Sequence, residues 1–366
     1  MLKVEHLTVK AGTFLVSYVS LNVRPGTCHV ILGPTGSGKT VLLEALIGLR
    51  NPIGGRIWVE GCDVTSRPIE ERGFGYVPQD LALFPHMTVR KNILYAQRVR
   101  KNVRSNADLF DSIVGSLGIN GLMQRGISSL SGGERQRVAL ARAIVSGARV
   151  LILDEPLSSL HEGLRRELWF VLKDLAQSYN IAFLIVTHDL EEAFFLADEI
   201  TILLDGKVCH QGSATALAEN PQTIQVARFM GIRNLFTINE ISVDRTNIWG
   251  HSTDLGGKLS VAINACVTIE SHLQGLNGKC VVGIRSKDVV LYGTSAPANE
   301  CNLFTGTIKE IYQGGNVATI VTQTSPDGIT VECSLPLSDA ASVATVVGKP
   351  IYFGLPPEKL FILKDT

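Results

Sequence analysis

Eight residues near the start of the chain have the types and the spacing needed to hold phosphate groups. They are Gly33, Pro34, Thr35, Gly36, Ser37, Gly38, Lys39 and Thr40. Together they match the phosphate-loop pattern G-x-x-x-x-G-K-[S/T] at every fixed position. Glycine is needed because the loop must turn its backbone N–H groups toward phosphates through dihedral angles that a Cβ disfavours. The alternative is a glycine-rich turn that binds nothing, but we estimate only roughly 0.02 chance matches in such a chain.

The last two residues of this loop have the chemistry of a nucleotide site. The ammonium group of Lys39 would reach the β- and γ-phosphates, and the hydroxyl of Thr40 would bind Mg²⁺. The helix expected directly after the loop adds its unpaired N-terminal N–H groups and the positive end of its dipole. The pattern therefore predicts a site for a nucleoside triphosphate together with Mg²⁺.

Two carboxylates and a histidine farther along the chain have the chemistry of hydrolysis. Asp154 and Glu155 follow the apolar run 150–153, and His188 lies just past the apolar run 181–186. Asp154 would hold Mg²⁺ directly or through water, and Glu155 would accept the proton of the water that attacks the γ-phosphate. His188 would donate a hydrogen bond to that phosphate. The alternatives are a helix-capping acidic pair and a structural histidine, but the neighbouring phosphate loop favours the catalytic interpretation of the carboxylates.

Strands and helices alternate around these residues. The expected elements are strand 28–32, a helix opening at 41–47, a strand from 74, strand 150–153, helix 162–180, strand 181–186, helix 190–197 and strand 200–204. This alternation predicts an α/β fold with a parallel sheet covered on both faces. In such sheets ligands bind at the C-terminal ends of the strands. Because Gly33, Gln79, Asp154, Glu155 and His188 all follow strand ends, we expect them to converge on one site.

Length and composition limit the class of protein. The 366 residues predict two or three domains, and the 34 Lys and Arg balance the 34 Asp and Glu. This balance argues against a nucleic-acid partner. Only 19% of the residues are charged, which fits either a large core or a buried interface with a partner. We find no apolar run of membrane-spanning length and no signal peptide, and the seven scattered cysteines predict buried thiols in a reducing cytosol rather than disulfides or a zinc site.

The pattern changes along the chain. Residues 88–146 are mostly helical, whereas from about 231 helical periodicity disappears and short β-branched runs alternate with turns. We therefore expect a nucleotide-binding domain over 1–230, with a helical subdomain at about 88–146. A separate all-β domain, a small barrel, is expected over 231–366.

One further motif carries a family resemblance. The run 130–137, LSGGERQR, resembles the signature motif of ATP-binding cassette (ABC) ATPases, and the motifs described above occur in the order and spacing of that family. The resemblance covers about 1–230. It implies a homodimer with two ATP molecules, each between the phosphate loop of one subunit and Ser131, Gly132 and Gly133 of the other. It also implies that Gln79 binds Mg²⁺ and water and couples the site to a membrane partner.

The resemblance extends to the importer type. The stretch 83–89 resembles the segment that importer ATPases carry after the glutamine, and in relatives this helical region docks a permease. The part from 231 resembles their accessory β domain (TOBE/MOP-like). The chain as a whole most resembles molybdate/tungstate importer ATPases, with polyamine, sulfate, iron and sugar uptake as alternatives. The implied protein is a peripheral ATPase on the cytoplasmic face of the membrane, working with a permease and, indirectly, with an extracytoplasmic solute-binding protein.

Two other classes of function remain as alternatives. A soluble ABC ATPase acting on nucleic acid or in translation predicts long coiled coils, two cassettes in one chain or a basic face, and the sequence shows none of these. A nucleotide-sensing module without turnover has only His161 in its favour.

Three positions depart from the family pattern. His161 stands where the family usually has Asp in the loop that meets the partner's phosphate loop. The aromatic residue that usually stacks on adenine is missing at 10–11, so we expect Phe14, or else His6, to replace it. In the C-terminal domain, oxyanion-sensing relatives have Ser-Ala-Arg-Asn where this chain has Asn-Glu-Cys-Asn at 299–302.

Overall fold

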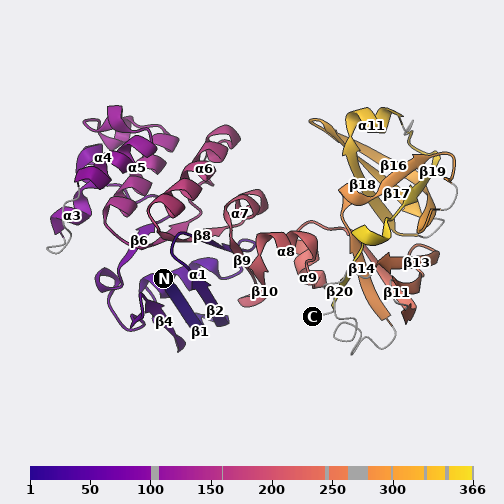
Figure 1. Ribbon diagram of the computed structural model, residues 1–366, viewed down its shortest axis with the longest axis horizontal. Coiled ribbons are helices and arrows are strands. Elements are labelled where there is room, and N and C mark those ends of the chain that lie inside the picture. The colour runs from indigo at the N-terminus through magenta and orange to yellow at the C-terminus, as the bar shows by residue number, and fades with distance from the viewer. Residues whose placement is uncertain are drawn as a thin grey trace. The chain divides into compact units, whose positions relative to one another are not determined.

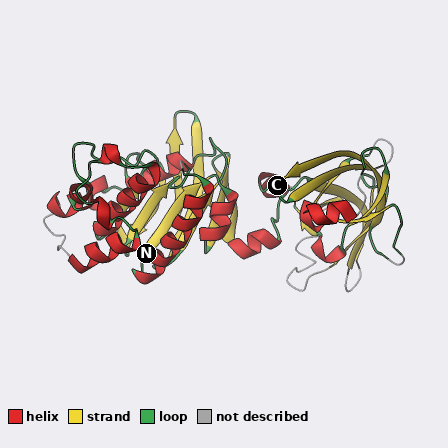
Figure 2. Ribbon diagram, turned by 90° about the horizontal axis from the view of Figure 1, so that it is seen from above, coloured by secondary structure: helices red, strands yellow, loops and turns green. Residues whose placement is uncertain are grey.

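The chain folds into two compact units, Met1–Ala218 and Glu219–Thr366 (Figures 1 and 2). A computed structural model describes residues 1–99, 107–158, 160–243, 247–262, 279–297, 300–324, 328–342 and 346–364. The second unit begins earlier than the expected 231. The reason is that helix α9 (Ile224–Phe229) belongs to it: Ala227 packs in one buried cluster with Phe361 and Leu363.

A six-stranded sheet is the centre of the first unit, with strand order β10-β9-β3-β8-β7-β6. Its strands are β3 (Cys28–Leu32), β6 (Phe74–Val77), β7 (Val150–Asp154), β8 (Ala182–Thr187), β9 (Glu199–Leu204) and β10 (Lys207–Ser213). All neighbours pair in parallel except β9 and β10. Strands β3, β7 and β8 are buried along their whole length, which explains why they appear in the sequence as continuous apolar runs.

A second, antiparallel sheet lies in the same unit. Its order is β2-β1-β4-β5, with β1 (Leu2–Ala11), β2 (Phe14–Val23), β4 (Gly54–Val59) and β5 (Cys62–Asp63). Helix α1 (Lys39–Ile47) packs between the two sheets, because Leu42, Leu43 and Leu46 share one buried cluster with residues of β1, β2, β7 and β8. The helix is apolar on nearly all sides, as a helix covered from two directions must be.

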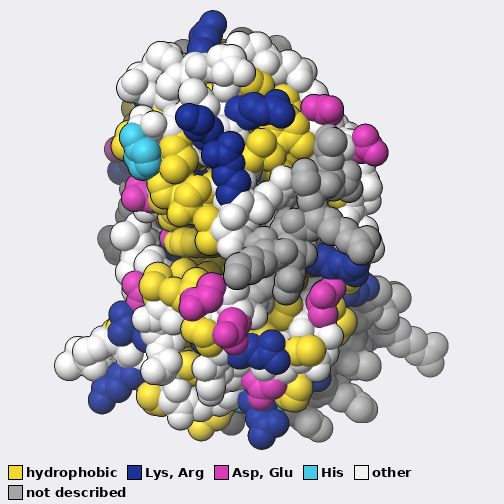
Figure 3. All heavy atoms as spheres, turned by 90° about the vertical axis from the view of Figure 1, so that its left-hand side faces the viewer, with side chains coloured by type: hydrophobic (Ala, Val, Ile, Leu, Met, Phe, Trp, Pro, Cys, Tyr) yellow, Lys and Arg dark blue, Asp and Glu magenta, His cyan; other side chains and the backbone are white. Residues whose placement is uncertain are grey.

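Further helices flank these sheets. They are α2 (Val89–Ile93), α3 (Tyr95–Val99), α4 (Ala107–Ser116), α5 (Gly132–Val145), α6 (Glu162–Ser178), α7 (Leu190–Leu196) and α8 (Ala214–Glu219). Short 3₁₀ turns occur at Ile69–Glu71, Asn120–Leu122 and Ile127–Ser129. Helices α3 to α5 lie together beside the sheets (Figure 1), and the face they present carries apolar side chains among Lys and Arg (Figure 3).

The second unit is built from antiparallel sheets, as expected. One has the order β13-β12-β11-β14-β20 and the other β15-β19-β16-β17-β18. The strands are β11 (Asn234–Val243), β12 (Asn247–Ser252), β13 (Gly257–Ala262), β14 (Lys279–Ile284), β15 (Val290–Gly293), β16 (Leu303–Gly314), β17 (Val317–Thr324), β18 (Thr330–Pro336), β19 (Pro350–Gly354) and β20 (Phe361–Leu363), with α11 (Leu337–Ser342) and 3₁₀ turns at Ser286–Asp288 and Pro357–Lys359. Phe236, Val282, Phe304 and Phe353 bring side chains of both sheets into one core.

Two features bear on the sequence expectations. Within the ranges just given, no helix is long and apolar enough to cross a membrane. None of the six described cysteines forms a disulfide; three are buried (Cys28, Cys280 and Cys333), whereas Cys62 and Cys301 are exposed, contrary to the expectation of buried thiols throughout.

Candidate nucleotide-binding and hydrolysis site

The phosphate loop joins β3 to α1 in the conformation that its glycines permit. Gly36 and Gly38 have φ of 85° and 102°, in the left-handed region that favours glycine. A Cβ on Gly33 would lie 2.3 Å from the carbonyl oxygen of Leu203, so a side chain does not fit there. Gly38 is the N-cap residue of α1 and brings no side-chain cap, which leaves the first N–H groups of the helix open to a phosphate.

Lys39 is held at the mouth of this loop. Its ammonium group donates to the carbonyl oxygens of Gly33 (2.7 Å) and Pro34 (2.9 Å). Burial lowers the pKa of Lys39, and the nearby carboxylates of Glu155 and Asp154 act in the opposite direction. The hydroxyl of Ser37 is buried with no partner among the described residues. The loop thus holds a desolvated cation and an unpaired polar group, which suits an anionic ligand.

Most of the predicted site residues line one cavity of about 410 Å³. Its lining is Phe14, Thr35, Gly36, Gly38, Lys39, Thr40, Val41, Gln79, Asp154, Glu155 and His188. The parallel sheet explains the convergence, since β3, β6, β7 and β8 all end at the same edge. Gly33, Pro34 and Ser37 lie behind this lining in the same loop.

Asp154 and Thr40 lie at this edge with oxygen atoms that would suit a Mg²⁺ ion. The Asp154 carboxyl is 9% exposed, and burial together with the neighbouring Glu155 raises its pKa to about 6. Burial and the charge of Glu155 both disfavour the charged form of Asp154. A divalent cation bound beside it would stabilise that charged form. The residues therefore fit the ion, which would neutralise phosphate charge; Gln79 lines the same cavity.

Glu155 is in contact with both polar residues expected to act with it. Its Oε1 lies 3.0 Å from Nδ1 of His188, and its Oε2 lies 3.4 Å from the amide nitrogen of Gln79. The backbone of Glu155 has a φ of 44°, a strained value for a residue with a side chain. Its N–H donates to the carbonyl oxygen of Val186 (2.9 Å), so β8 helps to hold it in place.

The signature residues lie at a different cavity, of about 450 Å³, which Ser131, Gly133, Arg125, Arg137 and others line. The helix there, α5, begins at Gly132. The reason is a capping box: the Ser131 hydroxyl accepts from the N–H of Glu134 (3.2 Å), and the Glu134 carboxylate accepts from the N–H of Ser131 (2.7 Å). Within one chain the structure therefore does not bring Ser131, Gly132 and Gly133 to the phosphate loop.

The two candidates for stacking on adenine differ in position. Phe14 lies against the phosphate loop, since a Cβ on Gly38 would come within 2.8 Å of its ring. His6 is exposed in β1, does not line the cavity, and donates its N–H to the Ser20 hydroxyl. The geometry favours Phe14 over His6.

His161 is the N-cap residue of α6 and makes no side-chain capping hydrogen bond. The neighbouring position 159 lies outside the described residues. An aspartate at an N-cap would accept from the helix N–H groups, so the departure removes a cap as well as a charge.

Two arginines in contact with the loops of this site were not found from the sequence. Arg165 of α6 donates to Asp189 and to the carbonyl of Leu160, and Arg142 of α5 donates to the carbonyls of Leu81 and Ala82. A sequence signal exists for Asp189 alone: followed by Glu192, it has the spacing of a helix N-cap. Contacts over 24 or 61 residues leave no local pattern.

Comparison with known proteins decides the family. The model of the ABC transporter family matches residues 16–158. The molybdate/tungstate import ATP-binding protein WtpC of Pyrococcus horikoshii is 34% identical over 353 residues, which cover 96% of each chain. This chain belongs to the ABC transporter family. It is an ATPase subunit of the import type, in which ATP hydrolysis is coupled to transport.

Other relatives of this ABC ATPase carry different names. The Fe(3+) ions import ATP-binding protein FbpC of Mannheimia succiniciproducens is 34% identical over 310 residues, 82% of each chain. Among solved structures, the ATP-binding cassette MJ0796, described as a dimer in a post-hydrolysis state with ADP and Pi, has a TM-score of 0.51 at 25% identity. It covers 58% of this chain and 99% of its own. The expected fold class, a P-loop ATPase with an added β region, is confirmed.

Proposed function

We propose that this ABC ATPase powers the uptake of a small oxyanion, with molybdate or tungstate as the first candidates. The relative named for these anions aligns over 96% of both chains, so the alignment includes the second unit. The relative named for Fe(3+) is equally identical but aligns over 82%. Iron is therefore the second candidate, and polyamine, sulfate and sugar uptake remain further alternatives.

The observation that carries the catalytic proposal is the convergence of Lys39, Asp154, Glu155, Gln79 and His188 on one cavity. The phosphate loop and the N-terminus of α1 would bind the phosphates of ATP, and Phe14 would contact the base. Mg²⁺ bound at Thr40 and Asp154, with Gln79 nearby, would supply charge neutralisation.

In the reaction itself, Glu155 would accept the proton of the attacking water. His188, in contact with Glu155, would donate a hydrogen bond to the γ-phosphate.

We further propose that two copies form the working ATPase. Ser131, Gly132 and Gly133 stand at the start of α5, where bare N–H groups and a positive dipole end suit the γ-phosphate held by a second copy. Their separation from the phosphate loop within one chain supports this arrangement. The pair would sit on permease subunits at the cytoplasmic face of the membrane, and a solute-binding protein outside the cell would deliver the solute.

Glu155→Gln tests the site. The neutral amide cannot accept the proton of water, so hydrolysis should fall by at least ~100-fold while ATP binding persists. The variant should also accumulate as an ATP-bound dimer in size-exclusion chromatography. Glu191→Gln is the matched control, because Glu191 is an exposed carboxylate on α7. Hydrolysis by Glu155→Gln within a few-fold of the wild-type rate would remove Glu155 as the base.

Lys39→Ala tests nucleotide binding in the same assay. The ammonium group contacts phosphates in the ground state as well as in the transition state, so its loss should abolish ATP binding itself. Equilibrium titration with a fluorescent ATP analogue measures this. Unchanged affinity would contradict the assignment of the phosphate loop.

The solute is tested with the importer reconstituted from this chain, its permease and its binding protein. Molybdate or tungstate should stimulate ATP hydrolysis, whereas Fe³⁺ and sulfate should not. Stimulation by Fe³⁺ alone would replace the oxyanion proposal with the iron alternative.

A further inference from the structure

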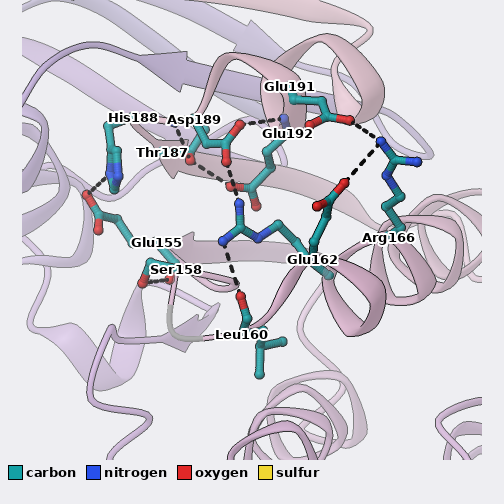
Figure 4. Close-up of polar contacts among 11 residues, drawn as sticks. Glu155, Ser158, Leu160, Glu162, Arg166, Thr187, His188, Asp189, Glu191 and Glu192 are labelled. Atoms are coloured by element: carbon teal, nitrogen blue, oxygen red, sulfur yellow. Dashed lines mark hydrogen bonds and ion pairs between the residues drawn. The ribbon is translucent and has the colours of Figure 1, made fainter. Parts of the chain in front are cut away.

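The loop from Glu155 to His161 connects β7 to α6 and starts at the proposed base. Its first part is fixed from two sides. The Glu155 N–H donates to Val186, and the Ser158 hydroxyl donates to the Glu155 carbonyl oxygen at 3.1 Å (Figure 4). Its last part, at Leu160, is fixed by a residue of the following helix.

That residue is Arg165, in the second turn of α6. One guanidinium nitrogen donates to Oδ2 of Asp189 at 2.6 Å, and another donates to the carbonyl oxygen of Leu160 at 3.2 Å. The side chains of Arg165 and Asp189 are only 25% and 26% exposed. A charge-assisted contact of this kind, made by a planar group with two donors, fixes direction as well as distance.

Asp189 is itself held in place, and it directly follows His188. Its Oδ1 accepts from the N–H of Glu192 at 3.1 Å, which makes it the N-cap residue of α7. Its own N–H donates to the Thr187 hydroxyl at 3.1 Å. His188 then contacts Glu155 at 3.0 Å, so the contacts form a closed ring from Glu155 through the loop, Arg165 and Asp189 back to Glu155.

We propose that Arg165 is a positioning residue for ATP hydrolysis, which holds the loop after Glu155 and the segment carrying His188 in one fixed relation. The proposal rests on the roles proposed above for Glu155 and His188. We call the two contacts of Arg165, to Asp189 and to the Leu160 carbonyl, the brace. Without the brace, Leu160 at the far end of the loop could move relative to Asp189. A misplacement of about 1 Å at reacting groups can cost a factor of ~100 in rate.

The neighbouring Arg166 also forms an ion pair between α6 and α7, but this pair lies on the surface. It pairs with Glu191 at 2.8 Å and Glu162 at 3.5 Å, and all three side chains are more than half exposed. Its contacts among the described residues are to these carboxylates and not to a loop carbonyl. Arg166→Met is therefore the matched control, since it also removes an ion pair between α6 and α7.

The test uses the full chain with Arg165→Met, Asp189→Asn and the double variant. Asn keeps the N-cap of α7 while removing the negative charge, so Asp189→Asn retains the fold even where Arg165→Met weakens it. The measurements are kcat and KM for ATP hydrolysis, affinity for a fluorescent ATP analogue, and urea unfolding.

We expect kcat to fall at least about tenfold in both single variants while nucleotide affinity stays within about twofold. The double variant should be no slower than the slower single variant, since both substitutions break the same link. Arg165→Lys should recover part of the rate, and Arg166→Met should stay within about twofold of wild type.

The proposal would be overturned by a fall in kcat of less than about tenfold in Asp189→Asn, or by losses of rate that add in the double variant. It would also be overturned if weaker nucleotide binding explained the loss of activity. Its failure differs from a failure of the proposed site. If Glu155→Gln remains active, the assignment of the base is wrong; if Glu155→Gln is inactive and the Asp189→Asn rate is normal, only the brace is wrong.

Discussion

At the scale of single residues, the active edge of the sheet depends on charges that burial makes costly. Asp154 and Glu192 are both buried carboxyls, with pKa values raised to about 6 and about 7. The first lines the cavity at the phosphate loop, where the proposed Mg²⁺ ion would compensate its charge. The second lies in the first turn of α7, and its ionisation should affect the stability of the fold.

Glu192→Gln should change how stability depends on pH. Burial raises the Glu192 pKa from 4.5 to about 7, although the Thr187 hydroxyl donates to it at 2.6 Å. The folded chain therefore binds the additional proton between these values, and the free energy of unfolding falls as pH rises through this window. Removing the group should raise stability at pH 8 relative to wild type by up to ~3 kcal/mol, with no such gain below pH 4.5.

Urea unfolding at pH 5 and pH 8 measures this difference. His29, which is buried and whose pKa is lowered to about 4, gives the opposite slope between 4 and 6.5 and is unchanged in the variant. Parallel stability curves for Glu192→Gln and wild type would contradict the prediction.

His161→Asp should affect both stability and communication between ATP sites. Asp at the N-cap of α6 would accept a hydrogen bond that His161 does not make, which should stabilise the chain by ~1 kcal/mol. Its charge should also raise ATPase activity or the Hill coefficient. His161→Asn is the control, because it caps without charge; an Asp variant with unchanged rate and Hill coefficient would disprove the effect on communication.

At the scale of elements, α1 is fixed at both ends. The phosphate loop forms its start, and Arg72 binds its end. The buried guanidinium of Arg72 donates to the carbonyl oxygens of Ala45 (2.7 Å) and Leu46 (2.8 Å) in the last turn. Arg72 also donates to the backbone carbonyl oxygens of Arg67 and Thr65. The last turn of α1 has no basic residue of its own, and Arg72 supplies the positive charge there.

Arg72→Met should therefore destabilise the chain by about 3–5 kcal/mol, because it leaves several buried carbonyls without a donor. Urea unfolding is the measurement. Arg50→Met is the control: Arg50 pairs with Glu44 of the same helix at 2.7 Å, but about a third of each side chain is exposed, so the loss should stay below about 1 kcal/mol. Equal losses of unfolding free energy in Arg72→Met and Arg50→Met would contradict a special role for the hydrogen bonds from Arg72 to the end of α1.

At the scale of the whole molecule, the second unit is the part whose role the family resemblance leaves most open. In oxyanion-sensing relatives the matching stretch has a hydroxyl and a guanidinium. Here Glu300 and Cys301 are exposed, and position 299 lies outside the described residues. The side chain of Asn302 is fully used, with hydrogen bonds to Ser260 N and O (2.7 and 2.6 Å) and to the carbonyl of Leu355 (2.8 Å).

We therefore predict that the chain does not bind free molybdate or tungstate in its second unit. Glu300 would repel a dianion by ~4 kcal/mol per pair of unit charges at 4 Å, if the effective dielectric constant is ~20. Calorimetric titration of the full chain without nucleotide measures this. A micromolar, saturable heat would show the prediction wrong, and its loss in Arg285→Met would locate the site.

The sequence by itself determined the chemistry and the order of elements. A phosphate loop, a carboxylate pair after an apolar strand and a signature motif each depend on residues close together in the chain, so local patterns reveal them. The same holds for helix α6 and strands β8 and β9, whose expected limits differ from the observed ones by only one or two residues.

Only the tertiary structure decided which distant groups meet. Three contacts join positions 20 or more residues apart: Arg165 with Asp189, Arg72 with the end of α1, and Phe14 with the phosphate loop. The last of these is what favours Phe14 over His6. Such contacts follow from the packing of helices and strands, and packing is not visible in the spacing of residues along the chain. The start of α5 at Gly132 and the early limit of the second unit were decided in the same way, by a cap and by a buried cluster.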